Sequence, residues 1–105
     1  MSLVVASSDL IGVRANGERF AISLRIGQPY ECAGETAYWS CPVSLEPLYL
    51  NLADQSGIDS FQALLLAGRL AITLLAGFKK DGGTLLYSDG TEFPLEAYVT
   101  APSPD

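Results

Sequence analysis

The sequence predicts an α+β fold, in which an antiparallel meander sheet of four to six strands carries one long helix on one face. Apolar residues recur at three- and four-residue spacing across Ser56–Lys80, which is typical of a helix. Apolar and polar residues alternate in several shorter segments on either side, which is typical of strands. Hydrophobic residues make up 49% of the 105 residues, enough for one core. We therefore expect a single domain over residues 1–98 and a flexible tail over residues 99–105.

The first predicted element is a hairpin centred on Asn16-Gly17, the strongest short-range signal for a two-residue turn. Its strands are Leu10–Ala15 and Glu18–Ile26, and both alternate in polarity. A two-residue turn fixes the strand register, so we expect Ile11 and Val13 on the face that enters the core.

The same register places two cations, Arg14 and Arg19, opposite each other on the reverse face of the hairpin. Like charges in that position repel each other. The pair is either a weak anion site or two solvated cations relieved by nearby acids such as Glu18. The second interpretation is favoured, because solvated charges are ordinary on an outer face.

Four further segments read as strands or as a strand and a turn. Thr36–Leu45 is a predicted strand in which Pro42, which has no N–H to donate, indicates a sheet edge or a bulge. Leu48–Leu52 is a predicted fourth strand with its leucines pointing inward. After the helix, Thr84–Tyr87 and Thr91–Phe93 predict a terminal hairpin or a strand followed by a turn.

The predicted helix carries start and stop signals at its two ends. Ser56 and Asp59 have the spacing of a capping box, in which the hydroxyl and the carboxylate each accept a free backbone N–H. The pair Lys79-Lys80 lies in the last turn, where cations suit the negative end of the helix dipole. The following Asp81-Gly82-Gly83 can supply a left-handed cap.

The predicted helix is apolar around most of its circumference and carries two ridges. The first ridge is expected to face the sheet: Phe61, Leu65, Ile72 and Leu75. The second ridge is the candidate dimer interface: Leu66, Leu70 and Leu74. A domain of this size can cover one ridge with its own sheet, so we expect a second copy to cover the other in a two-fold dimer. Arg69 divides the helix into apolar runs too short for a bilayer, so no membrane span is expected.

Composition argues against several classes of partner and chemistry. The net charge of −6 disfavours nucleic acid and leaves a basic protein partner as an option. Without histidine the chain cannot form the usual catalytic triads, and Cys32 and Cys41 alone cannot hold zinc. We therefore assign no catalytic residue, cofactor or metal site. Met1–Ala6 lacks the features of a secretory signal, so the expected location is the cytoplasm, where a disulfide is disfavoured.

Three residues are candidate ligand or partner contacts: Trp39, Gln62 and Arg69. Trp39 is either a stacking platform for a ligand or, in phase with apolar neighbours, a core residue. A pocket between helix and sheet, oriented by Gln62 or Arg69, would be lined by Trp39 together with some of Tyr38, Tyr49 and Tyr87.

Two short motifs, Trp39-Ser40-Cys41-Pro42 and Gly57-Ile58-Asp59-Ser60-Phe61-Gln62-Ala63-Leu64, resemble a family of small uncharacterised bacterial domains. In that family a Trp-x-Cys-Pro strand precedes a helix that begins Gly-Val-Asp-x-x-Gln-Ala-Leu, and Ile58 stands here at the valine position. The resemblance covers about half of the chain. It implies a bacterial origin and a shared fold, and no activity. Gln62 in this motif bonds either a neighbouring loop backbone or a partner.

Three function hypotheses follow. The first is a non-enzymatic protein-interaction module that self-associates, of which an immunity protein that neutralises a basic toxin is one version. The second is a small-molecule-binding domain with a pocket between helix and sheet. An enzyme is the third, and no pair of acidic residues has a spacing that recommends it.

Overall fold

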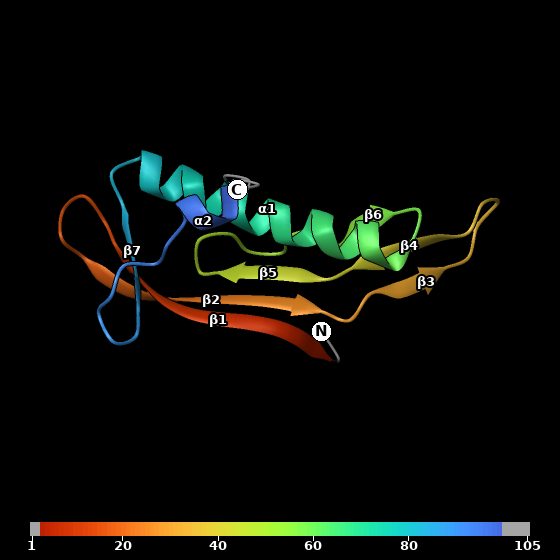
Figure 1. Ribbon diagram of the computed structural model, residues 1–105, viewed down its shortest axis with the longest axis horizontal. Helices are drawn as coiled ribbons and strands as arrows, with labels where there is room; N and C mark the ends of the chain where they lie inside the picture. The colour runs from red at the N-terminus through yellow and green to blue at the C-terminus, as the bar shows by residue number, and fades with distance from the viewer. Residues whose placement is uncertain (1–2, 100–105) are drawn as a thin grey trace, which may run out of the picture.

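The protein has an α+β fold in which one long helix lies along two antiparallel sheets (Figure 1). The structure is a computed structural model and describes residues 3–99. Its elements follow one another as β1 (Val4–Val13), β2 (Arg19–Gly27), β3 (Tyr30–Cys32), β4 (Tyr38–Cys41), β5 (Val43–Glu46), β6 (Gln55–Gly57), α1 (Ser60–Lys80), β7 (Thr84–Tyr87) and α2 (Glu96–Val99). The predicted α+β class and the long helix packed on one face are confirmed.

The strands form two sheets, where the sequence predicted one meander. The first sheet has the order β5-β2-β1-β7 and the second the order β3-β4-β6, and every pairing is antiparallel. The predicted strand Thr36–Leu45 contributes to both sheets. Its pairing in the second sheet ends before Pro42, and the chain enters the first sheet at Val43. α1 packs on β2 and β5 of the first sheet and on β4 and β6 of the second.

The β1–β2 hairpin has a three-residue loop, and the register expected from a two-residue turn is wrong by one position. The N–H of Arg14 donates to the carbonyl of Glu18 at 2.8 Å, and Gly17 adopts a left-handed φ of 89° inside the loop. The extra loop residue moves the other face of β1 toward the helix. Leu10 is therefore buried in the core in place of Ile11, which is half-buried.

The predicted strand Leu48–Leu52 is instead a turn. The N–H of Tyr49 donates to the carbonyl of Leu45 at 2.9 Å, which folds this segment back on the edge of β5. The first and last leucines of the segment pack against the core, as alternation predicts, whereas Leu50 is 68% exposed. The predicted inward position is therefore confirmed for Leu48 and Leu52 and wrong for Leu50, and the predicted strand conformation is wrong.

α1 begins later than predicted, with Asp59 rather than Ser56 as its N-cap. The Asp59 carboxylate accepts the N–H of Gln62 at 2.8 Å, and the side-chain oxygen of Gln62 accepts the N–H of Ile58 at 2.7 Å. Gln62 therefore bonds neighbouring loop backbone, which is one of its two predicted roles. Ser56 lies in β6, where its hydroxyl is 3.2 Å from that of Ser40.

The C-terminal end of α1 has the predicted chemistry. Lys79 and Lys80 lie in the last turn, and Gly82 adopts a left-handed φ of 97°. The N–H groups of Gly82 and Gly83 donate to the carbonyls of Lys79 and Phe78, which is a Schellman cap. The helix therefore ends where the sequence predicts.

The core face of α1 consists mainly of small residues, and the predicted assignment of its ridges is wrong for Phe61 and Leu65 but confirmed for Ile72 and Leu75. Four residues of α1 are buried against the sheets: Ala63, Ala67, Ala71 and Leu75. Leu70 and Leu74 of the second predicted ridge also pack against the core. Phe61 and Leu65 of the first ridge are 68% and 49% exposed. Because alanine allows close approach of a helix to its neighbours, the larger side chains remain on the outer side.

The segment after β7 returns to the core and ends in a short helix that the sequence did not predict. The predicted strand Thr91–Phe93 is reduced to a single bridge between Leu86 and Glu92. Leu95 is buried in the same cluster as residues of β1, β2 and β7, and α2 follows directly. The predicted flexible tail, residues 99–105, begins at the last residue of α2 and otherwise lies outside the described residues.

Candidate interaction surface

One side of α1 presents apolar side chains to solvent. Phe61, Leu64 and Leu65 are exposed, and Gly68 and Ile72 continue the same side along the helix. At 100° per residue these positions lie beside the alanine face, so the helix cannot bury both against its own sheets. We call these five residues the α1 flank. A contiguous exposed apolar patch on a folded domain commonly marks a binding surface.

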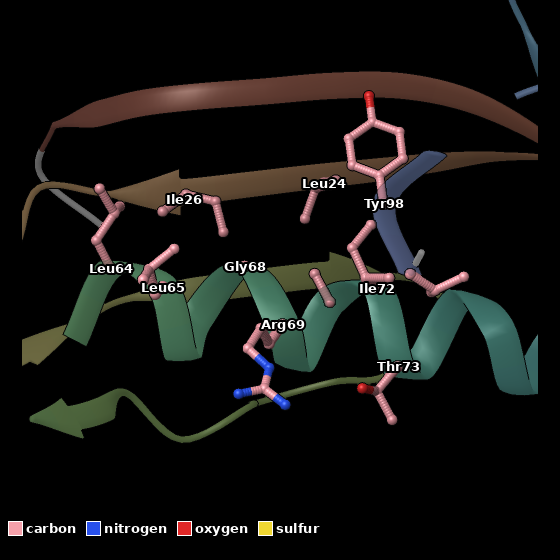
Figure 2. A pocket seen from close by; sticks show the side chains of 11 residues that line it. Leu24, Ile26, Leu64, Leu65, Gly68, Arg69, Ile72, Thr73 and Tyr98 are labelled. Carbon is pink, nitrogen blue, oxygen red and sulfur yellow. The ribbon is translucent and has the colours of Figure 1, made fainter. Parts of the chain in front are cut away.

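A groove of about 520 Å³ separates the α1 flank from the first sheet (Figure 2). Leu24 and Ile26 of β2 point toward the helix across this groove, and Tyr98 of α2 stands beside Ile72. Among the described residues that line it, Arg69 is the only charged one, and Figure 2 shows its guanidinium directed away from β2. The groove is therefore apolar, with its polar groups at the rim.

The first half of β1 forms a free sheet edge next to this groove. Ala6 and Ser8 of β1 pair with Ile26 and Leu24, the residues of β2 that line the groove. On its other side β1 pairs with β7 only from Leu10 onward. Residues 4–9 of β1 therefore pair with β2 alone among the described strands, and we call this stretch the β1 free edge.

The three predicted contact residues do not meet in one site. Trp39 lies on β4 and packs, half-buried, against the core cluster that contains Cys41, as its core interpretation predicts. Gln62 and Arg69 share a hollow of about 390 Å³ at the start of α1, and Arg69 also lines the rim of the groove. None of the tyrosines predicted to line a pocket, Tyr38, Tyr49 and Tyr87, borders the groove.

The predicted dimer interface of Leu66, Leu70 and Leu74 lies on the opposite side of α1 from the groove. Leu70 and Leu74 pack against the core clusters, and Leu66 is half-buried in the smaller hollow. These leucines are therefore largely covered by the chain itself. The uncovered apolar side is the α1 flank.

Sequence reasoning missed Tyr98, because no element was predicted near it. Its ring stacks on that of Phe93, with centroids 5.1 Å apart. The signal that could have found it is the spacing of Leu95 and Tyr98, three residues apart, which is compatible with one helical turn. Leu24 and Ile26 of β2 pack in a core cluster and also line the groove.

Ion pairs neutralise two of the hairpin cations. Arg14 lies 3.4 Å from the Glu18 carboxylate, and Arg25 lies 2.8 Å from that of Asp9. The predicted opposition of Arg14 and Arg19 is wrong, because the longer loop brings Arg14 against Glu18. The favoured interpretation, cations relieved by nearby acids, therefore fits the structure, and the anion site has no geometric basis. Asp9, the only charged residue of β1, is itself paired.

The two cysteines are free thiols in different surroundings. Cys41 is fully buried, where its thiol lies 3.3 Å from the carbonyl oxygen of Gly27 and burial raises its pKa. Cys32 is half-buried. Burial and a raised pKa make Cys41 an inert core residue. Among residues 3–99, no group of three His, Cys, Asp or Glu side chains could hold a metal ion.

The Tyr30 hydroxyl donates to the Asp54 carboxylate at 2.5 Å, and this hydrogen bond raises the pKa of the Tyr30 phenol. Both side chains are exposed. The raised pKa favours the protonated phenol. It lies on the second sheet and contributes nothing to the groove.

By length and composition alone, α1 is long and apolar enough to cross a bilayer. Within residues 3–99 no other helix meets these two criteria. Core helices of soluble proteins can have the same length and composition, and α1 buries an alanine face against two sheets. The composition of α1 is therefore a weak indication of a membrane span.

Comparisons of the chain with protein-family models, with curated proteins and with solved structures find no match. The resemblance to a bacterial domain family therefore stays a prediction, carried by the two motifs alone. Function has to be argued from the α1 flank, the groove and the β1 free edge.

Proposed function

We propose that this chain is a non-enzymatic protein-interaction module that self-associates, with the α1 flank and its groove inside the interface. The observation that carries the proposal is the exposure of Leu64 and Leu65, which line an apolar groove, although the chain has a core in which to bury such residues. Fully burying a side chain of this size stabilises an association by about 1.5–3 kcal/mol. A second protein surface supplies that burial.

The charges favour a protein surface over nucleic acid or an anionic membrane. The chain has a net charge of −6, and among residues 3–99 Arg69 is the only cation that lines the groove. Phosphate-rich partners are bound by clusters of Lys and Arg. A basic protein partner, including the immunity version of this role, rests on net charge alone, since no described residue at the groove carries a carboxylate. Self-association is therefore the version that the groove supports.

The test is the mass of the protein in solution. Sedimentation velocity of the wild-type chain across the micromolar range should show a dimer that dissociates on dilution. Leu65→Glu places a carboxylate in the interface of each copy and should weaken the dimer by a factor of about thirty or more. Leu50→Glu is the matched control, because Leu50 is also exposed but borders no part of the groove. A wild-type monomer throughout, or equal effects of the two variants, contradicts the proposal.

A small-molecule-binding role is the second candidate, because the volume of the groove lies within the range of about 300–1,000 Å³ typical of ligand pockets. An apolar fluorescent probe, 1-anilinonaphthalene-8-sulfonate, separates the two roles. If a second copy covers the groove, probe binding per chain rises as the protein is diluted to monomer. If the groove is a ligand pocket, probe binding per chain is independent of protein concentration, and Gly68→Leu abolishes it by filling open space.

A further inference from the structure

We propose that a second copy of this chain adds its β1 antiparallel to the β1 free edge, so that the two four-stranded sheets become one continuous sheet across a two-fold axis. This inference rests on the proposed self-association and names its geometry. The occupant is a strand, because an unpaired edge presents a row of backbone N–H and C=O groups that another extended chain satisfies.

The chain itself covers other edges of the first sheet. At the edge of β5, the carbonyl of Leu45 accepts the N–H of Tyr49 at 2.9 Å. At the edge of β7, the N–H of Tyr87 donates to the carbonyl of Thr91 at 2.8 Å. On the side where β2 pairs with β5, Arg19–Ile22 of β2 has no partner among the described strands. This stretch is shorter than the β1 free edge and begins with a cation. Within the described residues, the β1 free edge is the longest stretch of this sheet that pairs on one side only.

The side chains of the β1 free edge do not oppose pairing. Natural proteins protect edge strands with lysine, proline, inward-facing charges or bulges. From Leu3 to Ser8 the chain has neither charge nor proline, and the one irregularity is a shift of register at Val5. The apolar residues at the start of the strand are about half exposed. Asp9 ends the stretch with its carboxylate on Arg25 at 2.8 Å, so two copies of it do not meet as free charges.

The β1 of a second copy matches this edge in length and surroundings. A two-fold axis pairs identical segments antiparallel, so residues 4–9 of one copy pair with residues 4–9 of the other. This pairing ends before Leu10, because β7 already pairs with β1 from that residue onward. Because α1 packs on β2 and β5, the two helices then lie on the same face of the joined sheet (Figure 1). In each copy Leu64, Leu65 and Ile72 of the α1 flank point toward the groove (Figure 2), which in this dimer faces the space between the two helices. No carboxylate of the described part of the chain lines the groove, so acidic side chains of that part do not meet there.

The exposed apolar surface is of the size that a stable dimer needs. Large apolar residues at the start of β1, along the α1 flank and on α2 are between 37% and 68% exposed. At roughly 150–200 Å² for each side chain, they offer together roughly 700 Å² per copy, against about 800 Å² per partner in a standard interface.

Proline at Ser7 tests the edge pairing. Counting in steps of two from the hydrogen bond between Arg14 and Glu18, the N–H of Ser7 points away from β2. Ser7→Pro therefore removes a donor on the open side only, where edge strands tolerate proline. Ser7→Ala is the matched control, because it loses the same hydroxyl and keeps the N–H. In sedimentation velocity we expect Ser7→Pro to weaken the dimer about tenfold or more and Ser7→Ala to leave it unchanged, with the circular dichroism spectrum of both preserved.

The outcomes separate this inference from the proposed function. A dimer that Ser7→Pro leaves intact overturns the edge pairing, while self-association stands. A wild-type chain that is always monomeric overturns both. Amide hydrogen exchange is a second test that needs no proline variant. The Ser7 and Asp9 amides should exchange more slowly in concentrated wild-type protein than in monomeric Leu65→Glu, and equal rates overturn the edge pairing.

Discussion

Gly57→Ala tests the contact that fixes the start of α1 against the second sheet. Gly57 is the last residue of β6 and pairs with Trp39 of β4. A Cβ on Gly57 would lie 2.7 Å from the backbone nitrogen of Ala63 and 2.9 Å from the Cβ of Gln62. Ala63 is fully buried, so its backbone cannot move without disturbing the core. The start of the helix would have to shift by about 0.7 Å to restore an ordinary contact of 3.4 Å.

The expected cost follows from two opposing effects. Overpacking of this kind destabilises a folded state by about 1–3 kcal/mol. Replacing glycine also restricts the unfolded chain, which stabilises by about 0.4–1 kcal/mol. We expect a net loss of about 1–2 kcal/mol in the free energy of unfolding, or roughly 4–16 °C in Tm for a domain of this size.

Gly77→Ala is the matched control, because Gly77 lies inside α1 and an added Cβ meets nothing within 4 Å. It should stabilise the protein by about 0.5–1 kcal/mol. Urea unfolding followed by the fluorescence of Trp39, the only tryptophan, measures both variants at one fixed protein concentration. If Gly57→Ala is as stable as the wild type, the close approach of β6 to the helix is wrong.

Three further predictions test local chemistry. Asp59→Ala should lower the free energy of unfolding by about 1 kcal/mol through loss of the N-cap, and Asp59→Asn should retain most of it; equal losses would show that the cap is not made. Hydrogen bonds from the Thr91 hydroxyl and N–H lower the pKa of Asp89, so this carboxylate stabilises the turn above the ordinary aspartate pKa and loses that effect as pH falls through the lowered one. Urea unfolding should therefore show a destabilisation by Thr91→Ala at neutral pH that shrinks as the pH falls below the ordinary aspartate pKa of about 4, and a pH-independent difference contradicts this. With a colorimetric thiol reagent, Cys32 should react in the folded protein and Cys41 only after unfolding; simultaneous reaction contradicts the burial of Cys41.

The two ends of α1 differ in how well the sequence predicts them. At the C-terminal end one arrangement of Lys79, Lys80 and the glycines fits, and the structure has it. At the N-terminal end two capping patterns overlap, one from Ser56 to Asp59 and one from Asp59 to Gln62. Pairing of Ser56 in β6 keeps its segment extended and leaves Asp59 as the cap. Tertiary contact thus chose between two locally acceptable starts.

The position of the interaction surface was harder to predict than the existence of an uncovered side. Periodicity identifies α1 as apolar on most sides, and it cannot say which side packs. Hydrophobicity predicts that the large residues Phe61 and Leu65 face the core. The helix lies close to two sheets, however, and alanine fits that space. The hairpin error has a similar origin, since Asn16-Gly17 fits both a two-residue and a three-residue loop.

The topology explains why the α1 flank and the β1 free edge occur together. α1 packs on β2, β5 and β7, and the first part of β1, before Leu10, stays largely exposed, because the chain enters the helix from β6 in the second sheet. After the helix, the chain returns as β7 and pairs with Leu10–Val13 of β1. Because β7 has only four residues, residues 4–9 of β1 have no described partner strand on that side and pair with β2 alone. Both open surfaces therefore flank the groove at Leu24 and Ile26. One added strand would extend the sheet and bring a second helix onto the same face, whereas a small ligand in the groove would leave the open edge of β1 without a partner strand.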